Sequence, residues 1–204
     1  APTVVTGGAV AWKDERIVAA GVEADVRRAH PDARFLDAGG GLILPGLVNL
    51  HHHFYSALAR GLDPGTPMRD FPEILDRLWW RLDRALDPDT VRLSAQLAAA
   101  DCVRWGCTTV FDHHASPSCI RGSLDILAGA LETAGIGGVL CYEVSDRDGP
   151  AVRDAGLDEN RRFIEFILLF AIGKYGSVIA FDNRVANNIV YCCIITYQAI
   201  QPVA

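Results

Sequence analysis

The sequence predicts an α/β fold built around a parallel β-sheet. From residue 42 onward, strand-like apolar runs alternate with segments of helical periodicity, in the order strand, helices, strand, helix, strand, helix. Alternation of this kind is typical of βαβ units, in which a helix returns the chain so that successive strands lie parallel. The first strand, within residues 42–50, is a nearly continuous apolar run, which favours a strand buried on both faces.

The residues before this sheet predict a small domain of their own. Two short apolar runs, at 9–12 and 17–20, flank the polar residues 13–16, so they predict a β-hairpin. Residues 22–30 predict a short helix, which a proline ends. A glycine-rich break closes residues 1–41, and we place the domain boundary there.

The elements of the second domain, residues 42–163, follow from periodicity and end signals. Pro45 disfavours a regular strand, so the first strand is expected to begin at or after it. Apolar residues at helical spacing predict a helix over 71–86. The remaining expected elements are a helix from Pro88 to Gly106, a strand at 108–111, a helix capped by Ser123 and ended by Gly135, a strand at 136–144 and a helix from 151 to about 165.

Composition excludes several classes of partner. The chain has 204 residues, 22% of them charged, and a formal net charge of -6 without a cluster of Lys and Arg, so neither nucleic acid nor an anionic membrane is expected to bind. The first residues lack the basic and apolar regions of a signal peptide. The six cysteines form no C-x-x-C pair, which favours free thiols in a reducing compartment and a cytoplasmic protein.

The character of the sequence changes near residue 164. Isoleucine occurs six times in residues 1–163 and eight times in residues 164–204. The first part is rich in Ala, Arg, Asp and Gly, as a GC-rich gene tends to encode. Residues 164–204 are therefore interpreted as a divergent or aberrant tail: either a genuine C-terminal segment, or the product of a frameshift or an artificial join.

Three histidines at the end of the first strand carry the sharpest chemical signal. On a strand, residues i and i+2 project to the same side, so His51 and His53 are expected to point together and His52 away from them. Two imidazoles placed in this way can reach one metal ion at about 2.0–2.1 Å. The strand end also leaves an open coordination position, which a catalytic metal needs. H-x-H alone is weak evidence, with ordinary surface or core histidines as the alternative, but the Pro-Gly and the apolar strand before it favour His51 and His53 as metal ligands.

Polar residues also follow the next two strands. Asp112, His113 and His114 end the strand that contains residues 108–111, and Glu143 lies near the end of the third strand. Because the carboxyl ends of parallel strands collect on one face, these residues are expected to share a rim with His51 and His53. We interpret them as substrate-binding or supporting residues, with local hydrogen bonding and loop charge as the alternative.

The histidine-containing run and several later runs resemble those of a known family. The run Pro45-Gly46-Leu47-Val48-Asn49-x-His51-x-His53 resembles the first-strand signature of the amidohydrolase superfamily, in its cytosine-deaminase and chlorohydrolase-like branch. The runs at 78–87, 112–117 and 146–149 are more specific and are most similar to aminohydrolases of the SsnA type. The resemblance covers roughly residues 8–163.

The resemblance implies a TIM (β/α)₈ barrel with a small β-sandwich. Residues 1–41 would form part of the sandwich, and residues 42–163 the first three βα units of the barrel. It implies a hydrolase of C–N bonds other than peptide bonds, an aminohydrolase or deaminase of a cyclic amidine or purine-like small molecule. One divalent metal, Zn or Fe, would be held in part by His51 and His53. The sequence leaves formation of a homo-oligomer open.

The same resemblance implies that this chain lacks part of the site. The family takes a further His ligand from the fifth strand and an Asp ligand from the eighth, but no histidine follows His114. The acid and base residues of the family would likewise lie beyond this chain. The sequence is therefore predicted to be a fragment that is inactive as given, marginally stable and prone to aggregate through unpaired strand edges.

Two other interpretations remain open at this stage. The chain could be a non-catalytic remnant, or an interaction module that uses the exposed edge of its sheet. The same fold could also perform another amidohydrolase reaction, such as dechlorination or the opening of a cyclic amide.

Overall fold

A computed structural model describes residues 4–14 and 16–175 of the chain. The chain divides into two compact units, residues 1–45 and residues 46–204. Helix α6 (Pro150–Tyr175) continues through the beginning of the segment interpreted as a tail. The rest of that segment, residues 176–204, lies outside the described residues.

The first unit contains the predicted hairpin and helix. Strands β1 (Gly8–Lys13) and β2 (Arg16–Val22) pair antiparallel, with an irregularity after Ala11. Helix α1 (Glu23–Ala29) follows at once, and Glu23 and Asp25 in its first turn complement the positive end of the helix dipole. Both expectations for this unit are confirmed.

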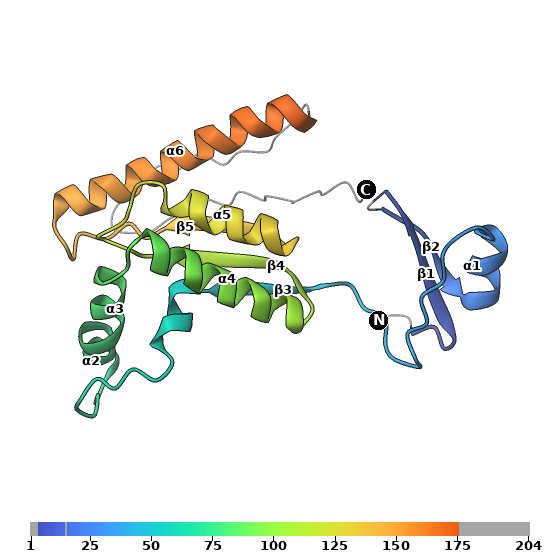
Figure 1. Cartoon of the computed structure of the whole chain (residues 1–204), viewed down its shortest axis with the longest axis horizontal. Helices are drawn as coiled ribbons and strands as arrows, with labels where there is room; N and C mark the ends of the chain where they lie inside the picture. The colour runs from blue at the N-terminus through green and yellow to red at the C-terminus, as the bar shows by residue number, and fades with distance from the viewer. Residues whose placement is uncertain (1–3, 15, 176–204) are drawn as a thin grey trace. The chain divides into compact units, whose positions relative to one another are not determined.

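The second unit contains a parallel three-stranded sheet (Figure 1). Its order is β3-β4-β5, where β3 is Leu47–His52, β4 is Cys107–His114 and β5 is Gly137–Tyr142. Both neighbouring pairs are parallel, so the three strands end at the same edge of the sheet. This confirms the predicted α/β class and the expectation that the first strand begins after Pro45.

Helices connect the strands as βαβ units require. A short 3₁₀ helix η1 (Phe54–Ala59) follows β3, and the expected helix over 71–86 consists of α2 (Phe71–Ile74), a π-helical turn η2 (Leu75–Trp79) and α3 (Trp80–Arg84). Helix α4 (Pro88–Arg104) begins with a reciprocal capping box between Asp87 and Thr90. Among the described helices, none is both long enough and apolar enough to cross a membrane.

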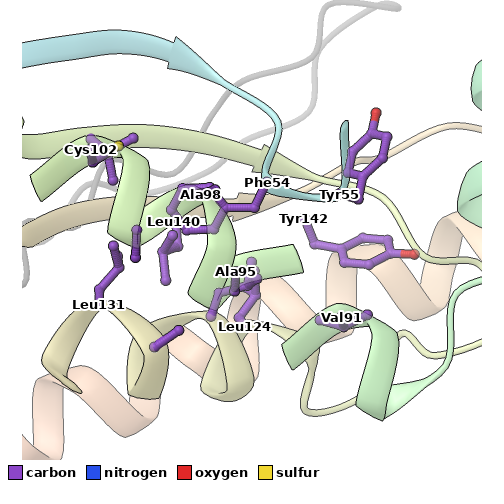
Figure 2. Packing of buried hydrophobic residues seen from close by; sticks show 14 of the residues in the cluster. Phe54, Tyr55, Val91, Ala95, Ala98, Cys102, Leu124, Leu131, Leu140 and Tyr142 are labelled. Atoms are coloured by element: carbon purple, nitrogen blue, oxygen red, sulfur yellow. The ribbon is translucent and has the colours of Figure 1, made fainter. Parts of the chain in front are cut away.

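The core of this unit lies between the sheet and the helices α4 and α5 (Ser123–Ala134), as Figure 2 shows. Val110 of β4 is fully buried, together with Phe54, the first residue of η1. Helix α4 contributes mainly small side chains, which let α5 approach it closely. The fully buried leucines of α5, which fill the remaining space, are Leu124, Leu127 and Leu131.

The prediction that Ser123 caps α5 is wrong. The cap position is Gly122, whose φ of 84° lies in the left-handed region, and the Ser123 hydroxyl has no hydrogen-bond partner. The first backbone N–H groups of the helix are instead bound by Glu159 of α6, which accepts from Gly122 at 3.0 Å and from Leu124 at 3.2 Å. A buried carboxylate is a stronger acceptor than a hydroxyl and complements the helix dipole.

The prediction that the first strand is buried on both faces is also wrong. Leu47, Val48 and Leu50 of β3 are 54%, 53% and 72% exposed. The physical reason is that β3 is an edge of the sheet, and among the described residues no strand pairs with its outer side. Apolarity alone reports that a strand is suited to burial, while burial itself depends on what lies beside it.

Candidate metal centre

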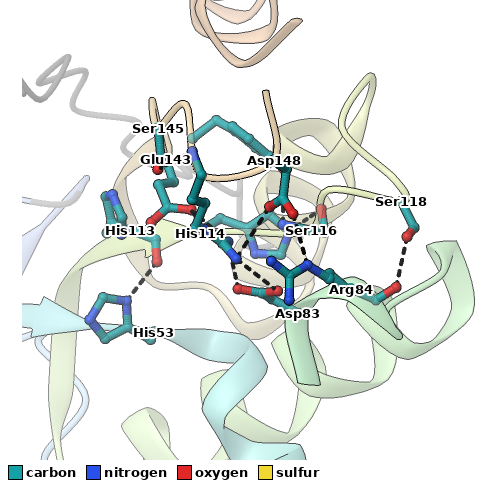
Figure 3. A network of polar contacts seen from close by, with 12 residues as sticks. His53, Asp83, Arg84, His113, His114, Ser116, Ser118, Glu143, Ser145 and Asp148 are labelled. Carbon is teal, nitrogen blue, oxygen red and sulfur yellow. Dashed lines mark hydrogen bonds and ion pairs between the residues drawn. The ribbon is translucent and has the colours of Figure 1, made fainter. Parts of the chain in front are cut away.

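The candidate site lies where β3, β4 and β5 end. The parallel register pairs His52 with Asp112, and His113 with Cys141, so the polar residues after the three strands gather at one edge (Figure 3). Strand alternation then divides these side chains between the two faces of the sheet.

His51 and His53 converge, as their spacing predicts. Their Nε2 atoms are 3.0 Å apart, and their rings meet edge to face with centroids 4.9 Å apart. Two nitrogens that each lie about 2.0–2.1 Å from one tetrahedral zinc ion are about 3.3 Å from each other. The observed separation is therefore close to the one that a shared metal ion requires.

A backbone carbonyl fixes the orientation of the second imidazole. The Nδ1–H of His53 donates to the carbonyl oxygen of His113 at 2.8 Å. This hydrogen bond selects the tautomer in which Nε2 carries a lone pair, and it turns that lone pair toward His51. Metal-binding histidines are held in this way by a carbonyl or carboxylate behind them. The donor chemistry of this pair thus fits a divalent metal.

His52 and Asp112 lie together on the opposite face of the sheet. The Nδ1 atom of His52 is 3.5 Å from Oδ1 of Asp112, and this oxygen also accepts the backbone N–H of Phe54 at 2.7 Å. Asp112 is buried, with 2% of its surface exposed. The structure therefore gives Asp112 a role in holding the turn after β3, on the side away from the paired imidazoles.

The two histidines of β4 have different surroundings. His113 is half-buried, and its ring centroid is 5.5 Å from that of His53, on the same face as the pair. Burial lowers the pKa of His113, against the opposing effect of the Glu143 carboxylate. Its neutral imidazole therefore forms part of the surface beside the paired imidazoles of His51 and His53.

His114 is fully buried on the core side. Its Nε2–H donates to the Ser116 hydroxyl at 2.9 Å, because that hydroxyl uses its own proton to donate to the carbonyl of Cys119 at 2.7 Å. Burial lowers the pKa of His114 to about 4. The structure separates this residue from His113, although sequence analysis grouped the two.

Glu143, which the sequence places near the site, belongs to an ion-pair network (Figure 3). The other members of this network were not predicted to belong to the site. Arg147 donates to Glu143 at 2.8 Å and to Asp83 at 2.6 Å, and it also faces Asp148 at 3.3 Å. Arg84 donates to Asp148 at 2.8 Å. Burial raises the pKa of Asp83, although the hydrogen bonds from Arg147 oppose that shift. The signal was present in the sequence, since these residues come from the family-like runs at 78–87 and 146–149.

Tyr55 is a second neighbour, to which the sequence assigned no role. Its ring lies between those of His53 and His114, at 5.8 and 5.9 Å, and packs edge to face on Trp79. Burial raises the pKa of its hydroxyl, and the carboxylates of Asp83 and Glu143 raise it further. Tyr55 therefore stays neutral beside the candidate metal pair.

In residues 4–14 and 16–165, whose side chains the structure describes, no group of three or more His, Cys, Asp or Glu side chains could hold a metal ion. A parallel sheet with polar side chains at its carboxyl edge places the protein among α/β proteins that carry their candidate site at that edge, and two converging imidazoles lie there at the end of β3. Two imidazoles are fewer than the three protein ligands that a catalytic zinc normally has.

Comparison with known proteins identifies the family. The model of the amidohydrolase family matches residues 42–186, so the chain belongs to the amidohydrolase family. Over 148 residues it is 34% identical to 8-oxoguanine deaminase of Pseudomonas aeruginosa. The matched region covers 70% of this chain and 32% of the relative. Over 165 residues it is 34% identical to 5-methylthioadenosine/S-adenosylhomocysteine deaminase of Nitratidesulfovibrio vulgaris. This match covers 80% of the chain and 35% of the relative. The chain thus spans about a third of the length of these relatives.

Solved structures share the fold. Guanine deaminase of E. coli matches 78% of this chain and 37% of its own, with a TM-score of 0.61 at 18% identity. The atrazine chlorohydrolase TrzN of Arthrobacter aurescens, solved in complex with zinc, matches 81% of this chain and 38% of its own. The TM-score of this match is 0.56 at 22% identity. These likenesses concern the architecture, and they agree with the parallel sheet described above.

Proposed function

We infer that this chain carries the first part of a metal-dependent aminohydrolase, with His51 and His53 as two ligands of one divalent metal, Zn or Fe. The observation that carries this inference is the 3.0 Å separation of the two Nε2 atoms, together with the carbonyl that fixes the His53 tautomer. The family and the similar deaminases support the same chemistry.

The reaction class is hydrolysis of a C–N bond other than a peptide bond. The substrate would be a cytoplasmic small molecule, a cyclic amidine or an amino-substituted purine, since the similar deaminases are named for substrates of that kind. Water would replace the amino group attached to a ring carbon, so that this carbon carries a carbonyl oxygen and ammonia is released. A bound divalent metal lowers the pKa of a coordinated water toward about 7 and so supplies hydroxide near neutral pH.

The chain's own residues have distinct parts in this proposal. His53 presents its Nε2 lone pair because its Nδ1–H donates to the His113 carbonyl, and His51 would present Nε2 in the same way to a bound metal. The neutral Tyr55 and His113 form the adjoining surface, and Arg147 holds the Glu143 carboxylate at the rim. In this proposal residues 42–163 supply the start of a (β/α)₈ barrel and residues 1–41 part of a β-sandwich. The remaining ligands and the acid and base groups lie elsewhere, so the 204-residue chain is expected to be inactive.

Metal retention tests the proposal. In equilibrium dialysis at a fixed free Zn²⁺ concentration, elemental analysis should find more bound zinc on the wild-type chain than on His51→Ala or His53→Ala. His52→Ala is the matched control, because its side chain lies on the opposite face and should not affect retention. A wild-type chain that retains no more zinc than the double variant His51→Ala/His53→Ala would refute the metal pair. An ammonia-release assay with 8-oxoguanine should detect no turnover by this chain.

A further inference from the structure

Two cysteines lie on either side of the turn that joins α4 to β4. Cys102 is in the last turn of α4, and Cys107 is the first residue of β4. The sequence contains no C-x-x-C pair and does not mark these two residues as partners. The fold nevertheless brings their thiols together.

The way in which α4 ends accounts for this contact. Trp105 is the C-cap, and Gly106 follows with a φ of 73°, in the left-handed region. The N–H of Gly106 donates to the carbonyl of Val103 at 3.1 Å, as is typical of a helix that ends at a left-handed glycine. In this kind of helix end, the third residue from the end of the helix commonly contacts the residue that follows the glycine. Those two positions are Cys102 and Cys107.

The two thiols differ in exposure. Cys102 is 5% exposed and belongs to the core cluster shown in Figure 2, whereas Cys107 is partly buried and packs against that cluster. Burial raises the pKa of the Cys102 thiol to about 11, and the neighbouring Cys107, which shares a hydrogen bond with it, contributes to this shift. Cys102 is therefore a poor nucleophile at neutral pH, and Cys107 is the thiol that a dissolved oxidant meets first.

The backbone around the pair is held on both sides. The N–H of Trp105 donates to the carbonyl of Asp101 at 3.1 Å, and the carbonyl of Gly106 accepts the N–H of Leu47 at 2.9 Å. The end of α4 and the start of β4 therefore stay close together while the thiols react. This contact lies within one helix–strand connection, so it depends neither on the paired imidazoles nor on the outer edge of β3.

We propose that Cys102 and Cys107 are a redox-sensitive pair, which a small-molecule disulfide such as oxidised glutathione converts to an intramolecular disulfide. The Cys107 sulfur attacks one sulfur of oxidised glutathione, whose S–S bond breaks and releases one glutathione thiolate. Cys102 then loses its proton to solvent, and its sulfur displaces the second glutathione from Cys107. The chain gives up two protons and two electrons, and oxidised glutathione becomes two reduced molecules. Excess reduced glutathione drives the same exchange backwards.

The test is oxidation of the full 204-residue chain by oxidised glutathione, followed by alkylation of the remaining thiols and tryptic peptide mapping. Trypsin separates Cys102, on residues 93–104, from Cys107, on residues 105–121. The two peptides should be found joined, with a mass two hydrogen atoms below their sum. The same oxidation in concentrated urea should spread cross-links to other cysteines, because unfolding separates the pair.

Stability gives a second measurement. A disulfide restricts the unfolded chain, so the oxidised chain should unfold at a higher urea concentration than the reduced chain. An oxidised chain with a lower urea midpoint would overturn the proposal, because the folded turn would then not hold the two sulfur atoms in a geometry that suits a bond.

Variants identify the two partners. Cys119→Ser is the matched control, because Cys119 lies on the same tryptic peptide as Cys107, and this variant should form the cross-link at the wild-type level. Cys107→Ser and Cys102→Ala should each abolish it, and Cys107→Ser alone suffices if the change in the core prevents folding. A folded wild-type chain that stops at a glutathione adduct, links through Cys119 instead or does not react would overturn the pair.

Discussion

The ends of β3 and β4 carry similar residues in contrasting environments. Both strands end in histidines, and their ends are neighbours in one sheet. At β3 the imidazoles of His51 and His53 face an open side, whereas at β4 His114 lies fully buried among aromatic rings. Residue type and strand position therefore identify candidate metal-binding histidines. Burial and hydrogen bonding then determine which of these side chains can offer a nitrogen lone pair to a metal ion.

The largest effect on the free energy of unfolding is expected from a substitution in the packed core, compared with one on the exposed strand β3. Leu131→Ala removes a fully buried side chain from the core and should lower the free energy of unfolding by about 2–5 kcal/mol. Leu50→Ala, on the exposed β3, should change it by less than about 0.5 kcal/mol. Chemical denaturation of both variants checks this contrast. Equal losses would show that β3 is buried in solution.

The buried histidine should make stability depend on pH. The folded state lowers the pKa of His114 to about 4, below the ordinary value of 6.5, so the folded chain resists protonation that the unfolded chain accepts. Its contribution is complete above pH 6.5 and is lost as the pH falls toward 4, with a total of about 3 kcal/mol. His114→Asn should flatten this part of the curve of unfolding free energy against pH. Parallel curves for variant and wild type would contradict the assignment.

A smaller effect is expected at the acceptor that holds the turn after β3. Asp112→Ala leaves the buried N–H of Phe54 without its partner and should cost about 1–3 kcal/mol of stability. Asp89→Ala, at an exposed carboxylate of α4, is the matched control and should be nearly neutral. Thermal or urea unfolding measures both. If Asp112→Ala unfolds like the control, the turn does not depend on this hydrogen bond.

The smallest change in stability should accompany a clear change in solubility. Leu50→Lys places a charge on the exposed edge strand, and charged edge residues oppose pairing between sheets. Stability should stay within about 0.5 kcal/mol of wild type, while light scattering at micromolar protein should fall. Unchanged scattering would locate the self-association elsewhere in the chain.

Much of the fold followed from local sequence signals. Proline and glycine signals gave both ends of α4, and alternation along β3 placed His51 and His53 on one side. These features depend on residues within a few positions of each other, which is why a single sequence suffices to predict them.

What sequence reasoning missed depends on residues far apart in the chain. Glu159 replaces Ser123 as the partner of the first N–H groups of α5, over a separation of 35 and 37 residues. Arg147 and Asp83 meet across 64 residues. The exposure of β3 depends on the absence of a neighbour among the described strands, which its own apolar sequence does not report.

The spacing of the strands in the chain has a consequence for biosynthesis. The β4–β5 contact between Asp112 and Cys141 spans 29 residues, whereas the bond that places His53 on His113 spans 60. Translation proceeds at about 5–20 residues per second, so β3 leaves the ribosome roughly 3–12 s before its partner strand is complete. During that interval β4, the strand that pairs with this uncharged apolar segment in the described part of the chain, is still incomplete. The segment that presents the paired imidazoles therefore stays exposed and apolar on the nascent chain until β4 is complete, a state that favours aggregation.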